Sequence, residues 1–157
     1  MRVGIGFDAH PFLQGRPLRL GGVEIPHPLG LAGHSDGDVL LHAVADAVLG
    51  ACGRGSLGEH FPEGSGEWRG ADSSGLLRRV ADLARGAGYR LGNVDAVVIA
   101  EAPRLAPHAG AIRARLAEIL SVEPERVSVR GTSSNGLGFA GRGDGLAAFA
   151  VVLLESA

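Results

Sequence analysis

Two short segments of the chain carry side chains that could hold a metal ion. Asp8 and His10 are two residues apart, and residues with that spacing point to the same side of an extended strand. His42 lies in the run Val39–Leu49, where the only other polar residue is Asp46. One carboxylate and two imidazoles make a three-ligand set of the kind that binds zinc and leaves a fourth position for water or substrate.

The same apolar run belongs to a helix with one polar stripe, because Asp38, His42 and Asp46 are spaced four residues apart. The residues alone leave two interpretations open. In the first, His42 binds a metal and Asp38 or Asp46 orients its imidazole. In the second, His42 is a core histidine paired with one of these carboxylates, and Asp8 and His10 face solvent.

A second region typical of ligand binding is Gly131–Gly145, with the sequence GTSSNGLGFAGRGDG. The hydroxyls of Thr132, Ser133 and Ser134, together with backbone N–H groups among the glycines, could bind a phosphate. Arg142 adds a guanidinium that can pair with an anion. The loop lacks the Gly-Lys-Ser/Thr of a Walker motif, and a flexible Gly/Ser turn is the alternative interpretation.

The elements that must position these side chains follow from hydrophobic periodicity and from Gly and Pro. The pattern predicts helices at 39–49, 72–87 and 108–120, strands at 2–7, 93–101, 126–131 and 146–154, and a hairpin at 17–26. We expect Ser35 or Asp36 to cap the first helix, and residues 50–70 to form a loop. Strands and helices joined by hairpins and crossovers favour the α+β class, with residues 1–157 as one domain.

The composition excludes several classes of protein. The 157 residues are 45% hydrophobic and 20% charged, and the formal net charge of −2 gives no general attraction to nucleic acid or membrane. The single cysteine, Cys52, allows neither an internal disulfide nor a thiolate zinc site. Such sparse use of cysteine favours a reducing, cytoplasmic environment. No apolar stretch reaches the roughly 18–20 residues of a membrane span, so with this net charge we expect neither a membrane nor a nucleic-acid partner.

The whole chain resembles the 2-C-methyl-D-erythritol 2,4-cyclodiphosphate synthases of the non-mevalonate isoprenoid pathway. The segments that carry the resemblance are RVGIGFDAH, GGVEIP, HSDGDVLLHAVADAVLGA, FPE, GADSSGLLR, GYRLGNVDAVVIAEAPRLAPH and GLGFAGRGDGLA. They cover nearly the full length at matching spacing, and GFDAH with HSDGD…H is the most specific part. The resemblance implies an α+β domain with a mixed sheet, helices mainly on one face, and a homotrimer with active sites between subunits.

The resemblance also implies a reaction. The substrate is 4-diphosphocytidyl-2-C-methyl-D-erythritol 2-phosphate, whose 2-phosphate attacks the β-phosphorus to give the cyclic diphosphate and CMP. Asp8, His10 and His42 match the ligands of zinc or another divalent transition metal, and Mg²⁺ or Mn²⁺ binds with the diphosphate. His34 and Ser133 match catalytic positions that stabilise the transition state.

The resemblance further implies a set of substrate-binding residues beside the metal ligands. In the first half of the chain they are His34, Ser35, Ser56, Leu57, Gly58, Phe61, Pro62, Glu63, Gly64 and Ser65. In the second half they are Ala100, Glu101, Ala102, Pro103, Arg104, Leu105, Ala106, Gly131, Thr132, Ser133, Ser134, Asn135, Phe139 and Arg142. Residues 100–106 match the cytidine pocket that a neighbouring subunit contributes, and residues 131–133 match the loop beside the diphosphate.

Four positions depart from the family pattern. Asn135 stands where a Glu usually binds the second divalent ion, and Ser56 stands where an Asp usually holds the methylerythritol hydroxyls. Glu63 and Arg104 keep the charge of the usual Asp and Lys. We therefore expect weaker magnesium dependence or weaker substrate binding. The alternatives are a catalytically impaired homologue that binds zinc and a cytidine nucleotide, and a zinc-dependent phosphohydrolase.

Overall fold

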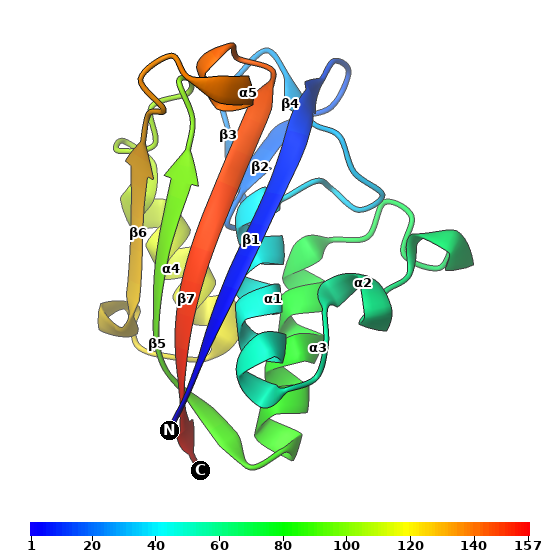
Figure 1. Ribbon diagram of the computed structural model, residues 1–157, viewed down its shortest axis with the longest axis vertical. Coiled ribbons are helices and arrows are strands. Elements are labelled where there is room, and N and C mark those ends of the chain that lie inside the picture. The colour runs from blue at the N-terminus through cyan, green and yellow to red at the C-terminus, as the bar shows by residue number, and fades with distance from the viewer.

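Five strands form one mixed sheet, which is the frame of the molecule (Figure 1). The computed structural model describes residues 1–157. The strands are β1 (Arg2–Leu13), β4 (Gly30–Leu31), β5 (Tyr89–Ile99), β6 (Val127–Thr132) and β7 (Gly145–Ser156), and a separate hairpin holds β2 (Leu18–Leu20) and β3 (Val23–Ile25). Their order in the sheet is β4-β1-β7-β5-β6, and only β5 and β6 run parallel.

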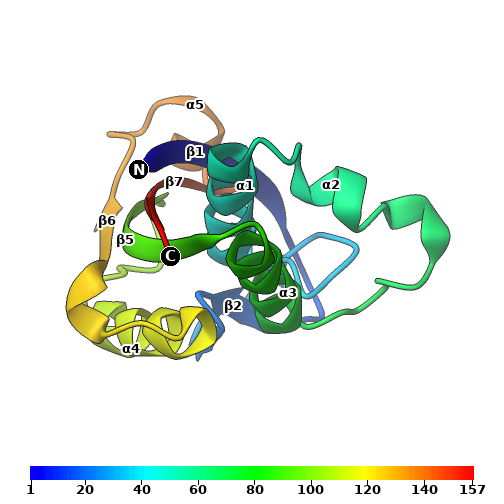
Figure 2. The ribbon, with the colours of Figure 1, turned by 90° about the horizontal axis from the view of Figure 1, so that it is seen from below.

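Helices cover one face of this sheet. The long ones are α1 (Val39–Cys52), α3 (Ser73–Gly86) and α4 (Ala109–Leu120), and the short ones are α2 (Leu57–His60), α5 (Gly138–Gly141), η1 (Glu63–Ser65) and η2 (Pro124–Arg126). Figure 2 shows α1, α3 and α4 gathered on the same side of the strands. The apolar core lies between these helices and the sheet, which confirms the predicted α+β class with helices mainly on one face.

The helix α1 lies unusually close to β1. A Cβ atom on Gly6 would be 1.9 Å from the carbonyl oxygen of Ala43, and one on Gly4 would be 1.9 Å from that of Ala47. Glycine is therefore required at both strand positions, because any side chain would push the helix away. This contact holds His42, in the first turn of α1, beside the second half of β1.

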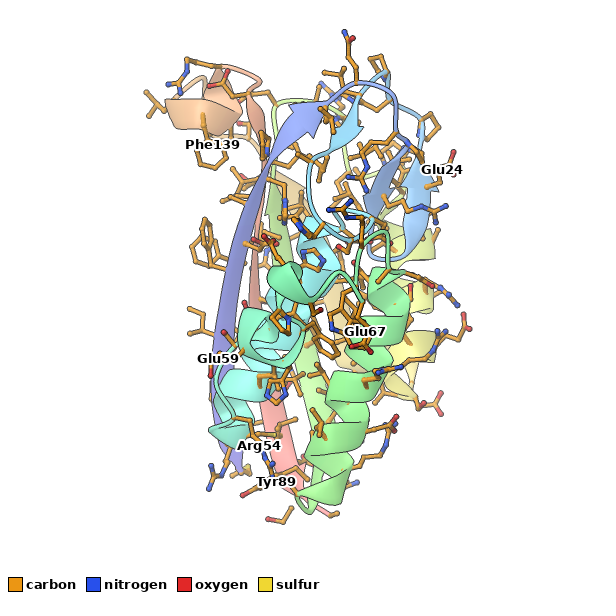
Figure 3. The ribbon with its side chains drawn as sticks, turned by 90° about the vertical axis from the view of Figure 1, so that its right-hand side faces the viewer. Glu24, Arg54, Glu59, Glu67, Tyr89 and Phe139 are labelled. Carbon is orange, nitrogen blue, oxygen red and sulfur yellow. The ribbon has the colours of Figure 1, made fainter.

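The opposite face of the sheet carries apolar side chains and no helix. Val3, Ile5 and Phe7 on β1 are 69%, 68% and 49% exposed, and Phe149 and Val151 on β7 are 40% and 44% exposed. The rings of Phe7 and Phe149 lie against each other, with centroids 4.7 Å apart. Figure 3, a side view, shows side chains standing out from the sheet on the side away from the helices. We call Val3, Ile5, Phe7, Phe149 and Val151 the outer apolar face.

The predicted elements are confirmed in type, with differences at their ends. β1 continues to Leu13, so Asp8 and His10 lie within a regular strand, and residues 50–70 contain α2 and η1 rather than loop alone. The predicted cap of α1 is wrong: the cap is Asp38, whose carboxylate accepts a hydrogen bond from the Leu41 amide at 3.0 Å. None of the helices is long and apolar enough to cross a membrane.

Candidate functional site

Asp8 and His10 from β1 and His42 from α1 meet at one point. The Oδ2 atom of Asp8 lies 2.7 Å from His10 Nε2 and 2.9 Å from His42 Nδ1, and the two nitrogens are 3.3 Å apart. A tetrahedral ion bound at about 2.0–2.1 Å would separate its ligand atoms by roughly 3.3 Å. The three donors therefore fit a divalent metal after a small outward shift, and the strand geometry brings them together as their spacing predicts.

The second ring nitrogen of His42 faces two serines. His42 Nε2 lies 3.0 Å from Ser35 Oγ and 2.9 Å from Ser73 Oγ, and the Ser73 hydroxyl donates to Asp36 Oδ1 at 2.5 Å. This chain of contacts runs from the imidazole N–H through a hydroxyl to a carboxylate. It favours the tautomer with the proton on Nε2, which leaves the Nδ1 lone pair for a metal.

Neither carboxylate of the polar stripe orients His42, so that prediction is wrong. Asp38 is fully buried and accepts hydrogen bonds from both glycine amides of the β2–β3 turn, the shorter from Gly22 at 2.7 Å. Asp46 accepts from the Leu57 amide at 2.6 Å and so ties α2 to α1. Burial raises the pKa of both carboxyl groups.

The Asp8 carboxyl and the His10 imidazole shift each other's pKa. Burial alone would raise the pKa of Asp8, but hydrogen bonds and charge from His10 and His42 outweigh it and hold this pKa well below the usual range. Burial alone would lower the pKa of His10, but the hydrogen bond and charge of Asp8 outweigh it and raise this pKa. Asp8 is therefore an ionised ligand at neutral pH.

A cavity of about 200 Å³ opens over these three ligands. Its lining residues are Asp8, His10, His34, Ser35, His42, Asp46, Leu57, Gly58, Phe61, Glu63, Trp68 and Leu76. At its mouth, His34 Nδ1 lies 3.5 Å from Glu63 Oε2. The predicted residues Ser56, Pro62, Gly64 and Ser65 do not line the cavity. We call this space the metal cavity.

A second cavity, of about 360 Å³, lies where β5 and β6 end. Its lining residues are Val98, Ala100, Glu101, Pro103, Arg104, Leu105, Ala106, Gly131, Thr132 and Ser133. The predicted residues Ala102, Ser134 and Asn135 do not line it. We call this space the strand-end cavity. It shares no residue with the metal cavity, and β7 separates β1 from β5 in the sheet.

The glycine-rich loop after β6 already uses several of the donors that we predicted for phosphate. Glu101 Oε1 accepts hydrogen bonds from Ser134 N at 2.9 Å, Ser134 Oγ at 3.1 Å and Gly136 N at 3.2 Å. The Ser133 hydroxyl donates to Asn135 Oδ1 at 3.3 Å. The Ser133 hydroxyl, on this longer bond, is left for a ligand, whereas Thr132 O already accepts from the Ala100 amide at 2.9 Å.

Two other predicted residues lie apart from both cavities. The guanidinium of Arg142 donates from Nε to Asp144 Oδ2 at 2.9 Å, so a carboxylate of the same chain already pairs with it. Phe139, in α5, lines a shallow hollow together with His10 and Pro11. Figure 3 places Phe139 at one end of the molecule and Tyr89 at the other. A cavity of about 290 Å³ lies at the Tyr89 end, and no predicted site residue lines it.

Comparison with known proteins identifies the group to which this arrangement belongs. The model of the YgbB family matches residues 1–155. The chain belongs to the YgbB family. Similar YgbB-type proteins include the 2-C-methyl-D-erythritol 2,4-cyclodiphosphate synthase of Geobacter sulfurreducens, which is 53% identical over 155 residues and 99% of both chains. The synthase of Salinibacter ruber is 53% identical over the full length of both chains.

Solved structures show the same YgbB fold. A 2C-methyl-D-erythritol-2,4-cyclodiphosphate synthase with bound CDP superposes with a TM-score of 0.90 at 37% identity, over 98% of this chain and 100% of that one. The bifunctional IspDF of Campylobacter jejuni superposes with a TM-score of 0.96 at 40% identity over 99% of this chain. Our chain spans 42% of the length of that bifunctional protein.

Several residues at the site of this YgbB-family structure were not predicted from the sequence. Ser73 and Asp36 support His42, and Trp68 and Leu76 line the metal cavity. The sequence contained one indication of Ser73, which directly follows the N-cap residue of α3 in the segment ADSSG. Trp68 is the only tryptophan of the chain, and its edge packs on the Phe61 ring at 5.0 Å between centroids.

Proposed function

We propose that the chain is a cyclodiphosphate synthase, a metal-dependent phosphorus–oxygen lyase. It would convert 4-diphosphocytidyl-2-C-methyl-D-erythritol 2-phosphate to 2-C-methyl-D-erythritol 2,4-cyclodiphosphate and CMP. The observation that carries the proposal is the convergence of Asp8, His10 and His42 in a chain whose full-length relatives are named for this product. An oxygen of the 2-phosphate bonds to the β-phosphorus, and the bond from that phosphorus to the departing CMP breaks.

Asp8, His10 and His42 would hold zinc or another divalent transition metal, because two imidazoles and a carboxylate suit such ions. When bound, the ion supplies Lewis acidity and a template at the β-phosphate. The protein's own part is to present one ionised carboxylate and two imidazole nitrogens from rigid elements. Ser73 and Asp36 support this role by holding the Nε2 proton of His42 away from the ion.

His34 and Ser133 are the proposed catalytic residues, acting by hydrogen bonds to phosphate oxygens in the transition state. Phosphoryl transfer of this kind depends on alignment and charge neutralisation more than on a covalent nucleophile. His34 stands at the mouth of the metal cavity beside Glu63, and Ser133 lines the strand-end cavity. The two residues can act on one substrate when the metal cavity of one subunit meets the strand-end cavity of another.

The strand-end cavity is the proposed site of the cytidine nucleotide. Its wall from Ala100 to Ala106 and the loop Gly131–Ser133 enclose a space large enough for a nucleoside, and Arg104 supplies positive charge for phosphate. Relatives of this fold have been solved with CDP, including a protein of Plasmodium falciparum at 32% identity and a TM-score of 0.87.

A second divalent ion, Mg²⁺ or Mn²⁺, is proposed to bind with the diphosphate, but weakly. Asn135 offers a neutral oxygen, and that oxygen already accepts a hydrogen bond from Ser133. The Ser56 hydroxyl donates to Glu59 at 3.0 Å, so it too has a partner within the chain. Both contacts support weaker handling of metal and substrate than carboxylates at these positions would give.

We further propose a homotrimer with active sites between its subunits. A ring in which each copy docks its strand-end cavity on the metal cavity of the next would complete every site. The outer apolar face supports this assembly, because a patch of that kind on a soluble protein commonly marks a contact between chains.

The test is a phosphorus NMR time course with the diphosphocytidyl substrate and zinc, with and without magnesium. We expect cyclic diphosphate and CMP to appear together, and His42→Ala to abolish both. His27→Ala is the matched control, because His27 stacks on Phe12 outside the metal cavity. CMP with a linear product would show a phosphohydrolase instead. No turnover by a zinc-loaded protein would show the impaired homologue that only binds zinc and nucleotide.

A further inference from the structure

Glu101 links the two segments that line the strand-end cavity, the chain after β5 and the glycine-rich loop after β6. The pairing of β5 with β6 ends at Ile99 and Thr132, and one more backbone bond follows, from Ala100 N to Thr132 O at 2.9 Å. Glu101 is the next residue, and its side chain crosses to the glycine-rich loop where the ladder stops. The amides of Ser134 and Gly136 donate to its single Oε1 atom, and the Ser134 hydroxyl lies 3.1 Å from that atom and 2.8 Å from a second acceptor, Leu137 O.

The loop that receives this contact also has bonds of its own, among them Leu137 N to Ser134 O at 3.1 Å and Ser134 Oγ to Leu137 O at 2.8 Å, but Glu101 ties residues 134–136 to the segment that follows β5. Asn135 and Gly136 follow one another with φ angles of 54° and 77°, both in the left-handed region. The Ser134 and Gly136 amides of this turn both donate to Glu101, whereas the Asn135 amide donates to Ser133 Oγ at 3.3 Å. A loop rich in glycine also loses more backbone entropy on becoming ordered than other loops, so an anchor matters more there.

The carboxylate that accepts from this turn belongs to the protein itself. Because Ser134 N and Gly136 N both point at Glu101, they are not directed at a substrate phosphate. Ser133 immediately precedes these donors, and its side chain lines the cavity. Its hydroxyl makes only longer contacts of 3.3 Å with Asn135, which a phosphate oxygen could replace.

We propose that Glu101 is a positioning residue that clamps the loop 131–136 and so fixes the Ser133 hydroxyl beside the diphosphate. Its importance for turnover rests on the proposed cyclisation. Its effect on the loop does not, because the hydrogen bonds to Glu101 exist without any ligand. Glu101 acts through the loop and touches no reacting atom.

The experiment compares Glu101→Ala and Glu101→Gln with the unchanged protein. Glu125→Ala is the matched control, since Glu125 is an exposed glutamate on η2 that lines neither cavity. Hydrogen exchange of the Ser134 and Gly136 amides is measured by NMR without substrate. Steady-state kcat and KM, and the affinity for CDP, are then measured on the same samples.

We expect Glu101→Ala to speed exchange of both amides by about tenfold, since a charged acceptor is lost. The value of kcat should fall by about 10- to 100-fold, as for other small misplacements of a catalytic group. CDP affinity should change by less than about threefold, because the nucleotide walls remain. Glu101→Gln keeps an oxygen acceptor and should restore most of kcat, and Glu125→Ala should match the unchanged protein.

Unchanged exchange of both amides in Glu101→Ala would overturn the clamp, whatever the activity. A fall in CDP affinity with unaltered kcat would also overturn it, because Glu101 would then be a direct nucleotide contact. Tighter binding of inorganic pyrophosphate by Glu101→Ala would also overturn the clamp. It would show that the loop amides bind substrate phosphate and that the Glu101 carboxylate occupies this position only when substrate is absent. Faster exchange in the variant, with no cyclisation by the unchanged protein, would instead contradict the proposed function and leave the clamp standing.

Discussion

At the residue scale, His42 is fixed at both of its ring nitrogens. Nδ1 points at Asp8, and Nε2 points at the hydroxyls of Ser35 and Ser73. Since the Ser73 hydroxyl donates to Asp36, it can only accept from the imidazole. These contacts accommodate a proton on Nε2, so that Nδ1, which contacts Asp8 in this structure, can present its lone pair to a metal bound between the two residues.

Removing the Ser73 hydroxyl should therefore weaken the metal site without removing a ligand. We expect Ser73→Ala to lower zinc affinity by about 10- to 100-fold, as loss of an outer partner of a ligand histidine does. Competition with a chromogenic zinc chelator measures the change. Ser128→Ala, on β6, is the control and should leave the affinity unchanged. Equal zinc affinities for the two variants would show that Ser73 does not orient His42.

Asn135 combines a backbone role with a chemical one. Its φ of 54° suits asparagine better than most residues, and its side-chain oxygen is engaged by Ser133. We expect Asn135→Glu to lower the magnesium concentration needed for half-maximal activity several-fold, because a carboxylate binds hard cations better. Asn135→Gln carries the same backbone cost without the charge, so it is the control. Superimposable magnesium titration curves for both variants would count against a metal at this position.

The i, i+2 spacing on a strand predicts that Asp8 and His10 point to one side, whatever the fold. His42 joins this candidate metal site by residue type, and its place beside them depends on how α1 packs on β1. They do not predict the partners of those ligands. Asp38 and Asp46 have helical spacing with His42, yet neither carboxylate bonds to it. Asp38 accepts from an amide of the hairpin turn, and Asp46 accepts from an amide of α2. Such contacts depend on where distant segments lie, which local periodicity does not encode.

At the element scale, the position of α1 depends on two strand glycines. Their hydrogen atoms are the only side groups small enough to let the helix backbone rest on β1. The ligands lie on these same two elements, so the distance between strand and helix also sets the distance between Asp8 and His42. The packing of α1 on β1 therefore also determines the geometry of the candidate metal site.

We expect Gly6→Ala to lower the free energy of unfolding by about 2–3 kcal/mol or more, because its methyl group would overlap the Ala43 carbonyl. It should also weaken zinc binding, since α1 must move outward. Gly75→Ala is the matched control: Gly75 lies in α3 with open space around its Cβ position, and alanine there should stabilise by up to about 1 kcal/mol. Urea unfolding of the metal-free proteins measures both, and equal midpoints would refute the close contact.

Strand and helix identities follow well from the sequence because hydrophobic periodicity is strong in α3 and β7 is a short, continuous apolar run. Element ends follow less well. The helix cap was placed at Ser35 or Asp36, whereas Asp38 caps α1 and Asp36 bonds instead to Ser73 across the site. Several oxygen-bearing residues in a row all satisfy the local rule for a cap, and only tertiary contacts choose among them.

At the scale of the whole molecule, the outer apolar face is the surface through which we expect copies of this chain to pack together. Side chains such as Ile5 and Val151 stand on the face of the sheet that no helix covers. In the proposed ring, this face turns inward and the cavities meet at the subunit boundaries. Folding, assembly and activity would then depend on one another.

We expect Ile5→Glu to convert the proposed trimer to monomers in light scattering, because three buried carboxylates would face one another. Turnover should fall by at least about 100-fold, since each site would lose one wall. Zinc content per chain should stay the same, because all three ligands lie on one chain. Leu83→Glu, at an exposed position on α3, is the control and should remain trimeric. A fully active Ile5→Glu monomer would refute sites shared between chains.

The absence of any residue common to the metal cavity and the strand-end cavity has one more consequence. The variants His42→Ala and Ser133→Ala should each be inactive, and each would keep intact the cavity that is altered in the other. Subunit exchange between them should create hybrid rings, each with one restored site, so that about a quarter of all sites become active in an equal mixture. Activity regained on mixing would be complementation within a single gene product, and its absence would mean that each chain works alone.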